Sequence, residues 1–121
     1  MKKPNVIKDK SYLFAIQIVR LYKFMIDQNE FIISKQVVRS GTSIGANIEE
    51  ALAAHSRRDF ISKMTISSKE ARETNYWLRL LRDSKLLVSV DLNALIKESE
   101  EIIKIITSIV KTSKSNQGHI S

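Results

Sequence analysis

Residues that interrupt a helix are scarce in this chain. It contains three Gly and one Pro in 121 residues, and Pro4 precedes every segment with a periodic apolar pattern. Proline removes a backbone donor and clashes with the preceding turn, and an interior glycine weakens a helix by about 1 kcal/mol relative to alanine. The sequence therefore permits helices of about twenty residues or more.

Apolar and small residues recur at helical spacing in four segments, at about residues 9–28, 29–54, 57–83 and 90–113. Steps of three and four residues place such a stripe on one face of a helix. In chain order the stripes comprise Phe14, Ile18, Leu21 and Met25; Val37, Gly41, Ile44, Ile48 and Ala51; Phe60, Met64, Ser67, Ala71, Thr74, Leu78 and Leu81; and Leu92, Leu95, Ser99, Ile102, Ile106 and Ile109.

The links between these segments are short. The second helix begins at Asn29 or at Ser34, whereas Ser56 and Asp59 stand in capping-box positions before the third. Short links make successive helices antiparallel neighbours. The sequence therefore predicts an all-α fold, an up-down-up-down antiparallel four-helix bundle with helices crossing at about 20°.

A chain of this length can form one hydrophobic core, so we expect a single domain over residues 1–121. Gly118 and its polar neighbours predict a flexible C-terminal tail at 114–121.

The absence of Cys excludes disulfides, thiolate metal sites and cysteine nucleophiles. No apolar stretch is long enough to span a membrane, since Lys104, Thr107 and Ser108 break the densest one, and we expect a cytoplasmic protein.

Positive charge is concentrated in two parts of the chain. The net charge is +7; residues 1–39 hold eight Lys and Arg against three Asp and Glu, and residues 57–82 hold seven against three. Such a surface attracts polyanions, although it can equally be a solvated basic surface. Aromatic residues are few and mostly on apolar lines, which disfavours base-specific recognition. The candidate phosphate contacts are Arg20, Lys23, Lys35, Arg39, Arg57, Arg58 and Lys63.

Two features exceed what a monomeric bundle requires. Gly41 and Gly45 lie four apart inside the second helix, which predicts a closely packed neighbouring helix there. The third helix carries a second stripe beside its core face, predicted to be an oligomer interface with charged pairs inside it. The alternative is a wide core face with Trp77 half exposed. This stripe comprises Ile66, Glu70, Glu73, Trp77 and Leu80.

The sequence carries no recognisable catalytic or metal-binding motif. A di-iron bundle needs Glu-x-x-His motifs, but neither His55 nor His119 follows a Glu by three residues. His55 is predicted to be a structural residue at the end of the second helix, and a phosphate-binding loop and a nucleophile elbow are both missing. We therefore expect no cofactor, no metal and no enzymatic activity.

A weaker hypothesis is a metal-dependent bundle enzyme that uses Glu50, Glu70 and Glu73. We expect Glu70 and Glu73 instead to pair with Arg72 or Arg79 of a neighbouring helix or subunit.

Five segments carry a family resemblance: FAIQIVRLYKFM at 14–25, RSGTSIGANIEEA at 39–51, SRRDFISKM at 56–64, KEARETNYWLRLL at 69–81 and EIIKIITSIVKTSK at 101–114. They resemble the bacterial four-helix-bundle family of 23S rRNA intervening-sequence proteins, also called S23 ribosomal proteins. The resemblance implies a ring-shaped homo-oligomer, a pentamer, with a positively charged surface. It also implies a relation to the accessory variability proteins of retroelements, and hence a partner such as a reverse transcriptase.

The sequence and the resemblance together predict a non-catalytic, oligomeric accessory protein that binds RNA or DNA. The competing hypothesis is a protein-interaction scaffold for a polymerase or a ribonucleoprotein, in which the positive face meets an acidic partner.

Overall fold

Each helix begins beside a side-chain oxygen, which accepts a hydrogen bond from a backbone N–H group of the first turn. The computed structural model describes the backbone of residues 5–120 and the side chains of 5–116. The helices are α1 (Val6–Asp27), α2 (Ile33–Leu52), α3 (Arg57–Ser84) and α4 (Asn93–Ile120). The oxygens belong to Asn5, Glu30, Ser56 and Asp91. These contacts explain why each helix starts where it does, because the first-turn N–H groups have no partner within the helix.

The helix boundaries differ most from the predicted ones at the start of the second helix and at the end of the fourth. The second helix begins at Ile33, close to the later alternative, since the Glu30 carboxylate accepts from the Ile33 and Ser34 backbone N–H groups. The fourth helix continues to Ile120, through the segment predicted to be a tail. Nothing between 114 and 120 forces a helix to stop, because a single glycine costs only about 1 kcal/mol. Ser121 lies outside the described residues.

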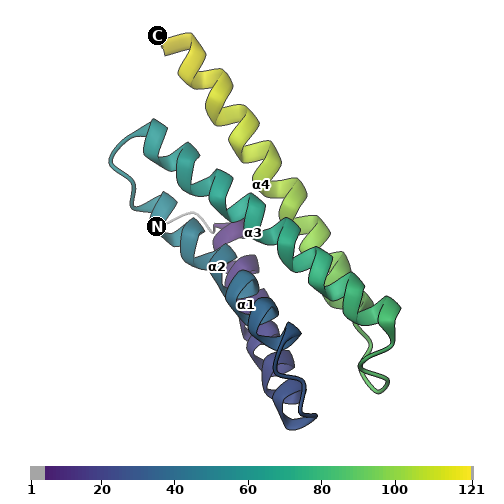
Figure 1. The fold of residues 1–121 in the computed structure, drawn as a ribbon. Coiled ribbons are helices and arrows are strands. Elements are labelled where there is room, and N and C mark those ends of the chain that lie inside the picture. The colour runs from purple at the N-terminus through teal and green to yellow at the C-terminus, as the bar shows by residue number, and fades with distance from the viewer. Residues whose placement is uncertain (1–4, 121) are drawn as a thin grey trace.

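The four helices form the predicted all-α up-and-down bundle (Figure 1). Helix α2 packs between α1 and α3, and α3 packs against α4, whereas α1 and α4 touch over a shorter stretch. No helix within the described part of the chain is both long and apolar enough to cross a membrane.

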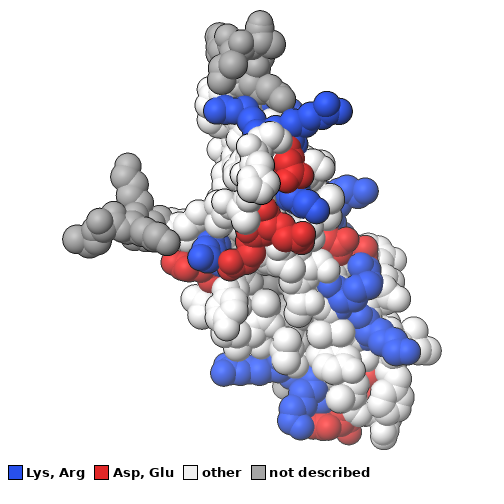
Figure 2. All heavy atoms as spheres, turned by 90° about the vertical axis from the view of Figure 1, so that its left-hand side faces the viewer, with Lys and Arg blue, Asp and Glu red and all other residues white. Residues whose placement is uncertain are grey.

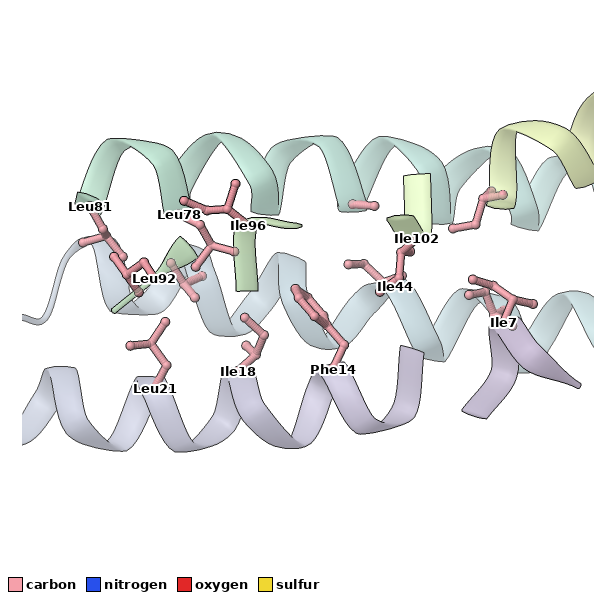
Figure 3. Close-up of a cluster of buried hydrophobic side chains, with 14 of the residues drawn as sticks. Ile7, Phe14, Ile18, Leu21, Ile44, Leu78, Leu81, Leu92, Ile96 and Ile102 are labelled. Carbon is pink, nitrogen blue, oxygen red and sulfur yellow. The ribbon is translucent and has the colours of Figure 1, made fainter. Parts of the chain in front are cut away.

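The predicted stripes form the core, with three partial exceptions. All the stripe residues of α1 and α2 are buried, and only Phe60, Leu95 and Ile109 are partly exposed among the rest. Figure 3 shows side chains of all four helices meeting in one cluster, for example Phe14 of α1, Ile44 of α2, Leu78 of α3 and Ile102 of α4. This cluster confirms the helical periodicity on which the fold prediction rests.

The close approach predicted at the two glycines is confirmed, and the neighbour is α1. A methyl group added at Gly41 would lie 2.7 Å from Cγ2 of Ile18, and one added at Gly45 would lie 3.3 Å from Oγ of Ser11. Small side chains also bring α3 close to α2, since the Ser67 hydroxyl donates to the Ile44 carbonyl at 2.8 Å.

A charged contact sets the register of α1 against α4. Nζ of Lys10 lies 2.7 Å from Glu98 and 2.9 Å from Glu101. Hydrogen bonds to the carboxylates raise the pKa of Lys10 above its ordinary value of 10.5, with the larger effect from Glu98 and the smaller from Glu101. In return, Lys10 lowers the pKa of Glu101. Because Lys10 is near the start of α1, residues of α4 beyond about 105 extend past α1 and pack mainly on α3.

Replacing Lys10 by Met should lower the free energy of unfolding at pH 7 by up to about 1 kcal/mol, as for a partly exposed ion pair. The contribution of Glu101 to the free energy of unfolding is fully present above the ordinary carboxyl pKa. It disappears as the pH falls through the lowered pKa of Glu101 in the folded protein. The Lys10 contribution exists below pH 10.5 and disappears as the pH rises through the raised value. Urea unfolding at several pH values measures this difference. As the pH falls into the acid range, the free energy of unfolding of Lys10→Met should decrease less steeply than that of the unmodified protein.

Lys8→Met is the matched control, since Lys8 makes only a 3.9 Å contact with Glu49 between half-exposed side chains. Its stability should follow that of the unmodified protein at every pH. If the free energy of unfolding falls equally steeply at acid pH in Lys10→Met and in the unmodified protein, the contact contributes nothing to stability.

Candidate nucleic-acid interface

The sequence-predicted phosphate contacts do not form one surface. Arg20 and Lys23 lie in the second half of α1, and Lys35 lies at the start of α2. Arg57 and Arg58 open α3, at the opposite end of the bundle, and Lys63 lies in the second turn of that helix. The length of α2, about 30 Å for its 20 residues, separates the two ends.

Carboxylates already neutralise three of the seven predicted contacts. Arg39 pairs with Glu70 and Glu73, Lys63 lies 3.6 Å from Glu50, and Lys23 lies 3.9 Å from Asp27. Within residues 5–116 the other four have no ion-pair partner and are exposed; these are Arg20, Lys35, Arg57 and Arg58. On the face shown in Figure 2, groups of Lys and Arg alternate with Asp and Glu, so its described part carries no continuous positive surface.

Glu70 and Glu73 pair with an arginine, as predicted, but the partner is Arg39 of α2 in the same chain. Nη1 of Arg39 lies 3.3 Å from Glu70, Nη2 contacts Glu73, and Nε1 of Trp77 donates to Glu73 at 3.0 Å. Arg72 and Arg79 of the same chain lie on other faces of α3, whereas the two carboxylates lie on the flank that faces α2. Their pairing with Arg72 or Arg79 of another subunit stays a prediction.

The three glutamates considered for metal binding do not converge on one site, because Glu70 and Glu73 share Arg39 and Glu50 does not join them. Glu50 pairs with Lys63, and no cluster of three His, Asp or Glu occurs in the described part of the chain. His55 lies in the loop after α2 ends at Leu52, exposed, and not on the buried line of that helix as predicted. The side chain of His119 lies outside the described residues.

The second stripe of α3 stays at the surface beside α2. Ile66 and Leu80 are 38% and 37% exposed, and Trp77 is partly buried against the core. The stripe thus has apolar ends open to solvent and the Arg39 ion pairs between them.

A groove between α3 and α4 gathers positive charge that the sequence analysis missed. Its volume is about 470 Å³, and it is lined by Thr65, Ser68, Lys69, Arg72, Thr107, Val110, Lys111 and Lys114. The lining holds four cations, three hydroxyls and no carboxylate. None of the four cations has an ion-pair partner among residues 5–116.

The same spacing on both helices produces the groove. Thr65, Lys69 and Arg72 follow one another at steps of four and three on α3, as do Thr107, Lys111 and Lys114 on α4. Steps of four and three keep a set of side chains on one helix face. Because α4 extends beyond α1 here, the segment 107–114 faces mainly α3. A search for cations on one face, in place of cations close in sequence, would have found this set.

The fold and the groove define an all-α bundle protein with an anion-attracting interhelical surface. The chain belongs to the family of 23S rRNA-intervening sequence proteins, whose family model matches residues 3–108. It is similar to a protein of unknown function from the S23 ribosomal protein family of Bacteroides thetaiotaomicron, with 52% identity and a TM-score of 0.83. The similarity covers 87% of this chain and 98% of that one. No curated protein has a significant match to the chain.

Proposed function

We propose that the protein is a non-catalytic, homo-oligomeric accessory protein of the cytoplasm that binds RNA or DNA through phosphate contacts on its basic surface. The observation that supports this proposal is the α3–α4 groove, where four cations converge without a carboxylate. A groove of this composition keeps its positive potential, whereas Arg39, Lys63 and Lys23 are neutralised locally.

The lining groups are suited to phosphate oxygens. Arg72 offers a planar set of donors, and the three lysines offer strongly solvated point charges. The hydroxyls of Ser68 and Thr107 add neutral donors to phosphate, whereas that of Thr65 donates to the Ile61 carbonyl at 2.7 Å. Contacts of this kind position a nucleic acid without reading its sequence.

Binding to RNA should fall steeply with salt. If each assembly neutralises about 6–10 phosphates, affinity should fall by roughly 10³–10⁵ between 50 and 200 mM salt. Fluorescence anisotropy with labelled RNAs of unrelated sequence measures both the slope and the lack of sequence preference. The absence of binding at 50 mM salt would refute the proposal.

The second candidate function is a scaffold for a protein partner such as a polymerase, a reverse transcriptase or a ribonucleoprotein. It is favoured by exposed apolar side chains in the two loops at one end of the bundle. Ile32 is 80% exposed and Val88 is 91% exposed, with Phe31 and Leu86 nearby in sequence. Retention of an acidic protein partner without any RNA binding would favour the scaffold.

The oligomer proposal rests on the second stripe of α3. Ile66→Glu combined with Leu80→Glu should convert an oligomer to a monomer, because both side chains reach the surface of the single chain and a charge there opposes burial in an interface. Melting curves verify that the variant is folded. Light scattering coupled to gel filtration at micromolar protein concentration measures the mass.

Leu86→Glu is the control, since Leu86 is 51% exposed in a loop away from the stripe, and it should leave the mass unchanged. A mass of 13.8 kDa for the unmodified protein throughout that range would contradict the oligomer.

A further inference from the structure

We propose that the α3–α4 groove binds a single strand of nucleic acid in preference to a duplex, and that the Tyr76 ring stacks on one of its bases. This inference rests on the proposed function, which it narrows to a class of ligand. It is carried by the cations on both sides of the groove and by the position of the exposed Tyr76 one turn beyond Arg72 on α3.

The groove lies between two neighbouring antiparallel helices, α3 and α4. Its four cations project from both walls, so a phosphate chain lying between them meets Lys69 and Arg72 on one side and Lys111 and Lys114 on the other. A single strand held there has unpaired bases that can reach an aromatic ring beside the groove, whereas a duplex keeps its bases stacked and paired.

Tyr76 continues the line of cations on α3. Thr65, Lys69, Arg72, Tyr76 and Arg79 follow one another at steps of four, three, four and three, which places them on one helix face. The Tyr76 side chain is 48% exposed. The distance from Lys69 to Arg79 along the helix is about 15 Å, which spans several nucleotides of a strand.

The ring is braced by its neighbours. Tyr76 packs edge-to-face on Trp77, with ring centroids 5.1 Å apart and an interplanar angle of 72°. Nε1 of Trp77 donates to Glu73, which also contacts Arg39. A ring held in this way loses little freedom when a base stacks on it.

The nearest carboxylate on either side of Tyr76 along α3 is engaged by an arginine. Glu73 contacts Arg39, and Asp83 accepts from Nε of Arg82 at 2.8 Å. Arg79, three residues beyond Tyr76, donates to Asn75 at 2.8 Å and remains without a carboxylate partner among the described residues. The ring thus stands between two available cations, Arg72 and Arg79.

The sequence analysis found the few aromatic residues mostly on apolar lines. Tyr76 is one that the structure places on the outer face of α3. Every base has a π-face, so stacking on Tyr76 adds affinity for unpaired strands without reading sequence.

The test compares three probes at fixed salt: a short poly(U) strand, the duplex of that strand with poly(A), and inorganic polyphosphate. Trp77 is the only tryptophan of the chain and contacts Tyr76, so its fluorescence reports a base at that ring. The poly(U) strand should bind more tightly than the duplex and quench Trp77, whereas polyphosphate should bind without quenching.

Tyr76→Ala should weaken poly(U) binding by roughly 5–150-fold and leave polyphosphate binding unchanged, and Tyr76→Phe should retain the affinity of the unmodified protein. Tyr12→Ala is the matched control, because Tyr12 is 63% exposed but belongs to α1, a helix that contributes no residue to the groove. Melting curves verify that each variant is folded.

Duplex binding as tight as poly(U) binding, with no effect of Tyr76→Ala, would overturn the inference and leave the proposed function intact. Equal quenching by polyphosphate would also overturn the stacking. No binding of any probe at 50 mM salt would overturn the proposed function together with the inference.

Discussion

Ile18→Ala should destabilise the bundle by about 2–5 kcal/mol, and adding Gly41→Ala to that variant should restore part of the loss. Ile18 is fully buried, so its truncation leaves a cavity against Gly41. A methyl group at position 41 would enter that cavity, and alanine also favours the helix by about 1 kcal/mol over glycine.

In the unmodified background the same Gly41→Ala change should have the opposite sign. The new methyl group would lie 2.7 Å from Cγ2 and 2.9 Å from Cγ1 of Ile18, a β-branched side chain with little room to turn. Overpacking of this kind costs about 1–3 kcal/mol, which outweighs the gain in helix propensity.

Urea unfolding of the two single variants and the double variant measures this reversal as a coupling energy. Gly45→Ala is the control, because the nearest atom there is the Ser11 hydroxyl at 3.3 Å, and its effect should be smaller than that of Gly41→Ala. A stabilising Gly41→Ala in the unmodified protein would show that Ile18 moves aside freely.

The sequence predicted the fold well because the buried stripes are a local property of each helix. A residue such as Ile44 or Leu78 is assigned to the core by its own helix's periodicity, without knowledge of its neighbours. Helix ends depend on single contacts. Glu30 caps α2 from outside the usual capping positions, so the pattern favoured neither start of that helix decisively.

Contacts between helices could not be predicted in the same way. Whether Glu73 meets Arg39 or an arginine from another chain depends on how α2 and α3 are rotated about their axes, and periodicity does not give that rotation. The groove was missed for a related reason. Counting charges along the chain averages over all faces of a helix, whereas Lys69 and Lys111 converge only after α3 and α4 have packed together.

Neutralising the groove should produce the largest effect on nucleic-acid binding. The variant combines Lys69→Gln, Arg72→Gln, Lys111→Gln and Lys114→Gln. If all four side chains contact phosphates of a single strand, the slope of log affinity against log salt should become shallower by about 3. At 100 mM salt this change corresponds to a roughly 10²–10³-fold weaker affinity.

The comparison variant is Arg57→Ala with Arg58→Ala, which removes two exposed cations at one end of the bundle. It should weaken binding to every sequence alike, but its slope should change by no more than about 1.5.

Both variants should remain folded, because the four groove cations have no carboxylate partner among residues 5–116 and removing like charges relieves repulsion between α3 and α4. Melting temperatures and light scattering verify this before binding is compared. An unchanged slope in the groove variant, beside a large change in the Arg57 and Arg58 variant, would move the interface to the start of α3 and restore the location predicted from charge density along the chain.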